Sequence, residues 1–164
     1  MKIKIDFSPL KKEGPPIIIV GAVQESEAVA NVCREKGIKV SAVCDSEPRR
    51  SQETLSELKI IHSPTLPKKF PKARFIIGCQ HVQDVVEQLT GYGYDEFYSP
   101  LGLLENYNIK KFEHSVSHSY MGKRLDVCRK THKAFFNQEK IYMRSSDIMV
   151  TTKCSLKCNN CSNL

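Results

Sequence analysis

Three cysteines, Cys154, Cys158 and Cys161, lie within eight residues of one another in the 164-residue sequence. Their spacing is CxxxCxxC, with short polar or charged stretches between the thiols. Thiolates this close along a loop can converge on one metal centre, either an iron–sulfur cluster or a zinc ion. The triplet is the strongest chemical signal in the sequence, and it predicts a metal site.

The residues before the triplet, 147–152, are strand-like, so the thiols would follow the carboxyl end of a strand. Barrel enzymes build their active sites at that end of their strands. The segment Thr151-Thr-Lys-Cys-Ser-Leu-Lys-Cys-Asn-Asn-Cys161 resembles the start of a radical S-adenosylmethionine (SAM) domain, whose signature is CxxxCx(aromatic)C after the first barrel strand. The resemblance is strong over residues 145–164, and it leaves the preceding residues as an N-terminal accessory domain.

The resemblance implies a [4Fe-4S] cluster held by Cys154, Cys158 and Cys161. Its fourth iron would stay open for the amino and carboxylate groups of S-adenosylmethionine, whose reductive cleavage gives a 5′-deoxyadenosyl radical. Asn160 stands where the family usually has an aromatic residue beside the adenine, a departure that weakens stacking more than cluster ligation. The resemblance also implies a barrel domain beyond Leu164, so we expect this chain to be a truncated part of an enzyme, inactive alone.

Two alternatives remain open for the triplet. Three cysteines and one histidine can form a tetrahedral structural zinc site, but no histidine is near in sequence, and His132 would have to supply the fourth ligand. The second alternative is a chance cluster of unbound thiols. Neither accounts for the strand before the triplet as the radical SAM interpretation does.

Residues 1–107 alternate strand-like and helix-like segments. The β-branched run 17–20 follows a Gly-Pro-Pro breaker and is typical of a buried parallel strand. Apolar residues at helical spacing predict helices over 25–36, ending before Gly37, and over 82–89. Further strands are expected at 38–43, 59–61, 74–77 and 95–98, the last of them at the edge. This order predicts an α/β fold: a Rossmann-like, open, mainly parallel sheet of four or five strands flanked by helices.

In such a sheet, small molecules bind past the carboxyl ends of the strands, and the turn from the first strand into its helix can hold a phosphate. Here that turn begins with Gly21 and Ala22, which are candidate cofactor-binding residues. Against the GxGxxG pattern, Val23 and Ser26 replace the second and third glycines, and Glu25 adds a negative charge. A side chain at Val23 would obstruct a pyrophosphate, which disfavours an NAD-dependent oxidoreductase.

Asp45, 24 residues after Gly21, is placed where an acid would hold a ribose hydroxyl, although it could instead cap the turn before Pro48. Gln80 and His81 follow another central strand and would project into the same crevice, where His81 could contact a ligand or move a proton. A surface or capping role is the alternative for His81. The expected ligand is a nucleotide or a nucleotide sugar, and the alternative role for the domain is docking a partner.

The charge of the chain is unevenly distributed. Residues 1–107 carry 14 Lys/Arg and 14 Asp/Glu, whereas residues 108–164 carry 11 and 4. Within the basic part, residues 120–136 form an amphipathic pattern with Met121, Leu125, Cys128, His132 and Phe135 on one face. We therefore expect three regions: a Rossmann-like domain (1–107), a basic linker with a connecting helix (108–144), and the first strand and cluster loop of a radical SAM domain (145–164).

Composition and motifs also limit the location and the partners expected for the protein. No apolar run approaches the length of a membrane span, and the N-terminus lacks the apolar core of a signal peptide, so a cytoplasmic location is expected. Groove-reading motifs and interleaved aromatics are not visible, which disfavours nucleic acid as a partner. Four scattered cysteines do not form a disulfide pattern and are expected to be buried apolar residues: Cys33, Cys44, Cys79 and Cys128.

Overall fold

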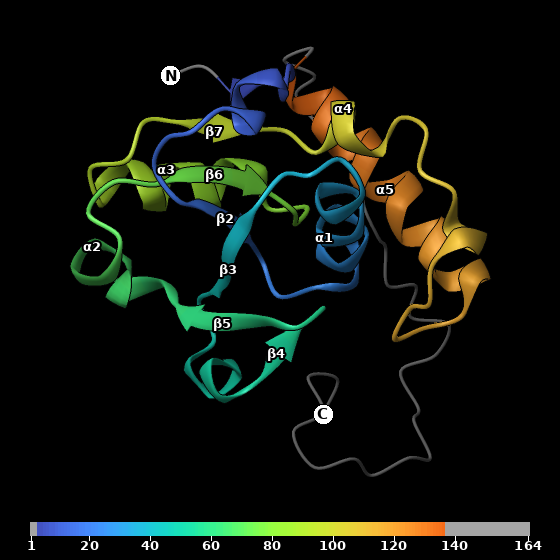
Figure 1. Ribbon diagram of the computed structural model, residues 1–164, viewed down its shortest axis with the longest axis horizontal. Coiled ribbons are helices and arrows are strands. Elements are labelled where there is room, and N and C mark those ends of the chain that lie inside the picture. The colour runs from blue at the N-terminus through green and yellow to red at the C-terminus, as the bar shows by residue number, and fades with distance from the viewer. Residues whose placement is uncertain (1–2, 137–164) are drawn as a thin grey trace, which may run out of the picture.

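A seven-stranded sheet forms the centre of the protein in a computed structural model that describes residues 3–136 (Figure 1). The strand order is β1-β7-β6-β2-β3-β5-β4, and every pairing is parallel except that of β4 with β5. The strands are β1 (Ile3–Lys4), β2 (Ile17–Val20), β3 (Val40–Asp45), β4 (Thr54–Leu55), β5 (Leu58–His62), β6 (Arg74–Ile77) and β7 (Phe97–Tyr98). The predicted α/β, Rossmann-like, mainly parallel sheet is confirmed.

All five expected strands are present, but two more strands extend the sheet. Both are only two residues long, too short to produce a sequence periodicity. β1 pairs with β7 through Ile3 and Phe97, so the prediction that the segment 95–98 lies at the edge was wrong. β4 turns back onto β5 through Ser56 and Glu57, which adopt positive φ angles of 49° and 70° without any glycine to mark the turn.

Helices cover both faces of the sheet (Figure 1). One layer contains α1, α4 and α5, and the other contains α2 and α3. The α-helices are α1 (Gln24–Glu35), α2 (Leu66–Lys69), α3 (Val82–Gly91), α4 (Leu101–Leu104) and α5 (His118–Phe136). Short 3-10 turns lie in the connections between elements, at Ser8–Lys11, Pro48–Gln52, Ser63–Thr65 and Ile109–Lys111.

The continuous apolar run of β2 supplies both faces of the sheet, because successive side chains of a strand point to opposite sides. Ile17 and Ile19 pack in the core beneath α1 and α5. Ile18 and Val20 pack in the core beneath α3. A strand buried on both faces needs no polar alternation, which explains why residues 17–20 are all apolar.

Helix α5 passes from one layer to the other. Met121 and Leu125, in its first half, are fully buried in the core that contains α1. Phe135 and Phe136, at its end, pack against the core that contains α3. The predicted apolar stripe is confirmed through His132, and within the described residues α5 is packed onto the α/β domain.

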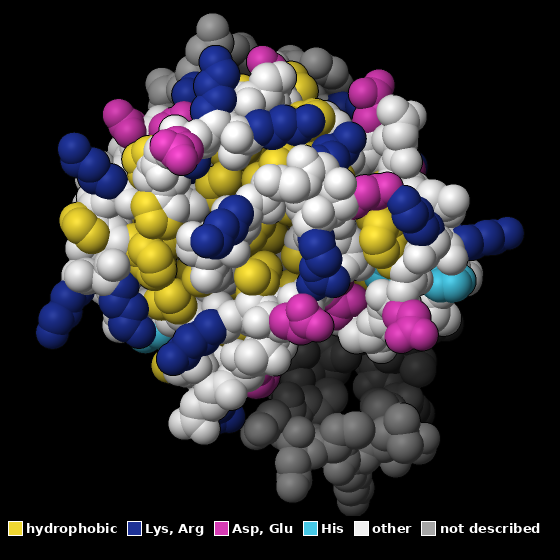
Figure 2. Space-filling view, viewed as in Figure 1, with side chains coloured by type: hydrophobic (Ala, Val, Ile, Leu, Met, Phe, Trp, Pro, Cys, Tyr) yellow, Lys and Arg dark blue, Asp and Glu magenta, His cyan; other side chains and the backbone are white. Residues whose placement is uncertain are grey.

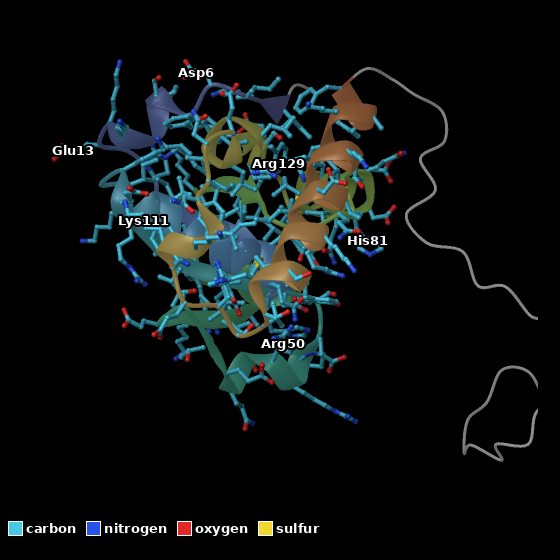
Figure 3. All side chains as sticks on the ribbon, turned by 90° about the vertical axis from the view of Figure 1, so that its right-hand side faces the viewer. Asp6, Glu13, Arg50, His81, Lys111 and Arg129 are labelled. Carbon is cyan, nitrogen blue, oxygen red and sulfur yellow. The ribbon has the colours of Figure 1, made fainter. Side chains whose placement is uncertain are left out.

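The basic face of α5 is only partly solvated. Arg124 pairs with Glu25 of α1, and Arg129 donates to the Leu104 carbonyl oxygen at 2.6 Å, in the space between α5 and α4 (Figure 3). These two basic side chains of α5 therefore contact other helices and do not simply face water. Lys and Arg are scattered over the face shown in Figure 2 instead of forming one continuous patch.

Several predictions concern residues outside the described range. The strand at 147–152, the metal ligands Cys154, Cys158 and Cys161, and the SAM-contacting position Asn160 all fall in this group. Within residues 3–136, none of the helices is both long enough and apolar enough to cross a membrane.

Candidate functional site: a crevice at the carboxyl ends of the strands

A cavity of about 400 Å³ opens where the strand order reverses. The chain builds outward from β2 through β3 to β5, then returns to the other side of β2 to build β6 and β7. Open α/β sheets bind ligands at this reversal, outside the carboxyl ends of the strands. Residues from these strand ends and from α3 line the cavity: Val20, Gly21, Val23, Asp45, Ser46, Ser63, Cys79, His81, Asp84, Val85 and Gln88.

Gly21 begins the turn between β2 and α1 and has a φ of +93°. A Cβ at this position would lie only 2.7 Å from the Cβ of Cys79, on the loop after β6. The Gly21 N–H donates to the Cys44 carbonyl oxygen at 2.8 Å, which fixes the turn against β3. Glycine is therefore required here both by the backbone conformation and by the close approach of Cys79.

Asp45 binds the same turn through its side chain. Its Oδ2 accepts a hydrogen bond from the Ala22 N–H at 2.7 Å, and its Oδ1 accepts one from the Glu47 N–H at 2.9 Å. The structure thus brings together Gly21, Ala22 and Asp45, three residues that the sequence selected as a candidate site. It also gives Asp45 the turn-capping role that was the alternative, since both of its oxygens accept backbone N–H groups.

Ser26, at the third glycine position, packs closely against β6. Its hydroxyl donates to the Gly21 carbonyl oxygen at 2.5 Å, and the space above it is left free by Gly78. A Cβ on Gly78 would overlap Ser26 Oγ and lie 3.0 Å from Ile19 Cγ2. In a dinucleotide-binding fold the third glycine allows close helix–sheet packing. Here Gly78, directly after the neighbouring strand β6, allows it. Sequence inspection missed Gly78, although a glycine ending an apolar strand is a recognisable signal.

Glu25, in the first turn of α1, is fully buried. Its carboxylate accepts a hydrogen bond from Gln80 Nε2 at 2.6 Å and pairs with the Arg124 guanidinium of α5 at 3.0 Å. The negative charge predicted to oppose a phosphate is therefore compensated within the protein. Gln80, expected in the crevice, instead uses its amide to hold Glu25.

His132 connects α5 to the ends of two strands. Its Nε2 lies 3.1 Å from the Cys79 carbonyl oxygen after β6, and its Nδ1 lies 3.1 Å from Ser99 Oγ after β7. Burial lowers the pKa of His132 to about 4, so the ring is neutral near pH 7. Both ring nitrogens are already engaged, which removes the free nitrogen that a fourth zinc ligand would need in this arrangement.

His81 lies at the outer surface at the start of α3 (Figure 3). Its side chain is 63% exposed, and its Nδ1 is 3.7 Å from Asp84 Oδ2. Both residues line the cavity. His81 is thus placed where the sequence predicted, at the mouth of the crevice, while Asp84, Ser63 and Gln88 are lining residues that sequence inspection missed because their positions depend on how the strands assemble.

The cavity wall is negatively charged. Asp45 and Asp84 belong to it, and none of the described residues that line it is Lys or Arg. Arg50 lies nearby and donates to the Ala22 carbonyl oxygen, where it is also paired with Glu53. Apolar surface comes from three valines of the lining set: Val20, Val23 and Val85.

The four scattered cysteines are buried, as predicted. Burial raises the pKa of Cys33, Cys44 and Cys128 to about 12 and that of Cys79 to about 11, so all four are protonated thiols at neutral pH. Over the described part of the chain, no group of three or more His, Cys, Asp or Glu side chains is arranged to hold a metal ion.

Comparison of the chain with models of protein families, with curated proteins and with solved structures gave no match.

Proposed function

We propose that this chain is the N-terminal part of a radical SAM enzyme whose Rossmann-like domain binds a small molecule of the nucleotide class. The radical SAM part of the proposal is supported by the spacing of Cys154, Cys158 and Cys161 after a strand-like segment. The binding part is supported by the cavity at the reversal of the strand order, next to Gly21, Ala22 and Asp45.

The cavity is the observation that carries the binding role. Its volume of about 400 Å³ falls in the range of small-molecule pockets, and it combines apolar wall with a few polar groups, as such pockets do. Asp45 ends β3 next to the first βα turn, the place where Rossmann-like proteins hold a ribose. The three cysteines would hold a [4Fe-4S] cluster, which supplies the electron for reductive cleavage of S-adenosylmethionine.

The cluster is tested by anaerobic reconstitution of the chain with iron and sulfide, followed by metal analysis and electron paramagnetic resonance. We expect iron uptake that depends on all three cysteines and is lost from Cys154→Ser, Cys158→Ser and Cys161→Ser variants. Without a barrel around it, the cluster should be labile and should not cleave S-adenosylmethionine. Cysteine-independent iron uptake would refute the assignment. Tightly held stoichiometric zinc in protein purified without iron would instead favour a structural zinc site.

A second test is the reading frame that follows Leu164 in the gene. The proposal expects it to continue through a βα barrel of about 200 residues. A stop codon directly after Leu164 would leave the three cysteines without the catalytic domain that the family requires.

The binding role is tested by calorimetry of the chain against nucleosides, nucleotides, UDP-sugars, NAD and NADP. Heat with any of these supports a ligand-binding domain, whereas no heat with all of them would leave partner docking as its role. An NAD-dependent oxidoreductase remains the second candidate. It is disfavoured by Val23 in the turn and by the negative cavity wall.

A further inference from the structure

Helix α5 restricts the crevice at the ends of β6 and β7. A dinucleotide lies across the strand reversal, with one half over each set of strands. Here α5 lies against the ends of β6 and β7, because His132 contacts the Cys79 carbonyl oxygen after β6 and the Ser99 hydroxyl after β7. The open cavity lies between the ends of β2, β3 and β5 and the segment formed by Cys79 and α3, and its volume of about 400 Å³ leaves room for one nucleoside.

One backbone N–H of the first βα turn is already bound by the protein itself. The Ala22 N–H, directly before the N-cap residue Val23 of α1, donates to Asp45 Oδ2 at 2.7 Å. Asp45 therefore places a carboxylate against this turn. A phosphate brought to this turn would find a carboxylate there and would also face Asp84, with no Lys or Arg among the described lining residues.

Asp45 can still bind a ligand that donates hydrogen bonds. A carboxylate has about four acceptor sites, and the backbone N–H groups of Ala22 and Glu47 use one site on each oxygen. The remaining site on each oxygen suits a pair of neighbouring hydroxyl groups. Val20, Val23 and Val85 add apolar surface against which a flat ring can pack.

From these observations we infer that the crevice binds a neutral ribonucleoside, with its 2′,3′-diol donating to Asp45, and discriminates against 5′-phosphorylated ligands. The inference rests on the proposed binding role and specifies its ligand class. It predicts that α5 and Asp45 together make the domain a nucleoside site and not a dinucleotide site.

The test is calorimetry of the full chain with adenosine, guanosine, cytidine and uridine, their 2′-deoxy forms, their 5′-mono- and diphosphates, and NAD. We expect at least one ribonucleoside to bind, with its 2′-deoxy form about tenfold weaker through loss of one donor. Its 5′-monophosphate should be weaker than the nucleoside by about tenfold or more, and NAD weaker still. A monophosphate or NAD binding as tightly as the nucleoside would overturn the inference while leaving a nucleotide-binding role intact. No binding by any ligand would overturn both.

Single substitutions distinguish an effect of wall charge on ligand affinity from a loss of folding. Asp84→Asn removes one wall charge from an exposed side chain, so the ratio of monophosphate to nucleoside affinity should rise by about two- to tenfold. Asp95→Asn, on an exposed loop outside the lining, is the matched control and should leave the ratio unchanged. Asp45→Asn should weaken the nucleoside and reduce the penalty of its 2′-deoxy form. If Asp45→Asn fails to fold, the Asp84→Asn variant still tests the inference. An unchanged ratio of monophosphate to nucleoside affinity in that variant would contradict discrimination by the wall charge.

Discussion

Arg124 of α5 and Glu25 of α1 form an ion pair with a nitrogen–oxygen distance of 3.0 Å. The Glu25 side chain is completely buried, whereas the Arg124 side chain is 31% exposed. The two residues are 99 positions apart in the chain. Their pairing attaches α5 to the first turn of α1, next to the crevice. It also satisfies a charge that the packing of α5 has removed from water.

Replacing Arg124 by methionine should therefore destabilise the protein by about 2–4 kcal/mol, because among the described residues it leaves the buried Glu25 carboxylate with the Gln80 amide as its side-chain partner. Chemical denaturation monitored by circular dichroism measures this change. Lys130→Ala on the same helix is the control: its pair with Asp126 is exposed, so its loss should cost less than about 0.5 kcal/mol. Equal costs for the two variants would contradict the role of burial. The Arg124→Met, Glu25→Gln double variant should recover part of the loss.

His132 predicts a pH dependence of stability. Its pKa in the folded protein is about 4, below its ordinary value of 6.5, so folding favours the neutral ring. The resulting stability is fully present above pH 6.5 and is lost as the pH falls from 6.5 towards 4, because only the unfolded state takes up a proton there. The loss should total roughly 3 kcal/mol.

Denaturation curves at several pH values between 4 and 7.5 check this prediction. His132→Gln should be less stable at pH 7 and should show a flatter profile over this interval. His81→Gln, which alters an exposed histidine, should keep the wild-type slope. A wild-type slope that persists in His132→Gln would show that another group is responsible.

Gly78→Ala should destabilise the fold by about 1–3 kcal/mol, because the added Cβ overlaps the Ser26 hydroxyl and presses on Ile19. Thermal unfolding measures the effect. Adding Ser26→Gly should relieve the overlap, so the double variant should be less destabilised than the sum of the two single changes. Gly91→Ala, at the end of α3 with no atom within 4 Å of its new Cβ, should be neutral or slightly stabilising.

Cys33, Cys44, Cys79 and Cys128 should resist alkylation in the folded protein, because they are buried and their pKa values of about 11 to 12 leave almost no thiolate at pH 8. Iodoacetamide treatment followed by peptide mass spectrometry checks each site. All four should react once the protein is unfolded. Rapid modification of Cys33 or Cys128 in native protein would contradict the packing of α1 or α5.

Much of the fold could be predicted because its signals are local. The apolar run at 17–20 and the helical spacing of Val82, Val86 and Leu89 follow from burial on one or both faces of an element. The stripe on α5 was visible for the same reason. The strands β1 and β4 were not predictable, since a two-residue strand exists only through its partner on a distant part of the chain.

The candidate site, like the fold, could be predicted only in part from the sequence. Gly21 and Asp45 could be selected from their distance along a βα unit, because that unit has a regular length. The structure alone decided that Asp45 binds Ala22, that Gly78 makes room for Ser26, and that α5 covers the ends of β6 and β7. These relationships join residues far apart in sequence, and no local pattern contains them.

By itself, the sequence determined the alternation of strands and helices, the basic amphipathic helix and the spacing of Cys154, Cys158 and Cys161, because each is a property of neighbouring residues. The tertiary structure decided which charges are paired, which residues line the crevice, and that the Asp45 carboxylate binds the first βα turn. Those features depend on which surfaces pack against each other and exclude water, and only the folded chain determines that.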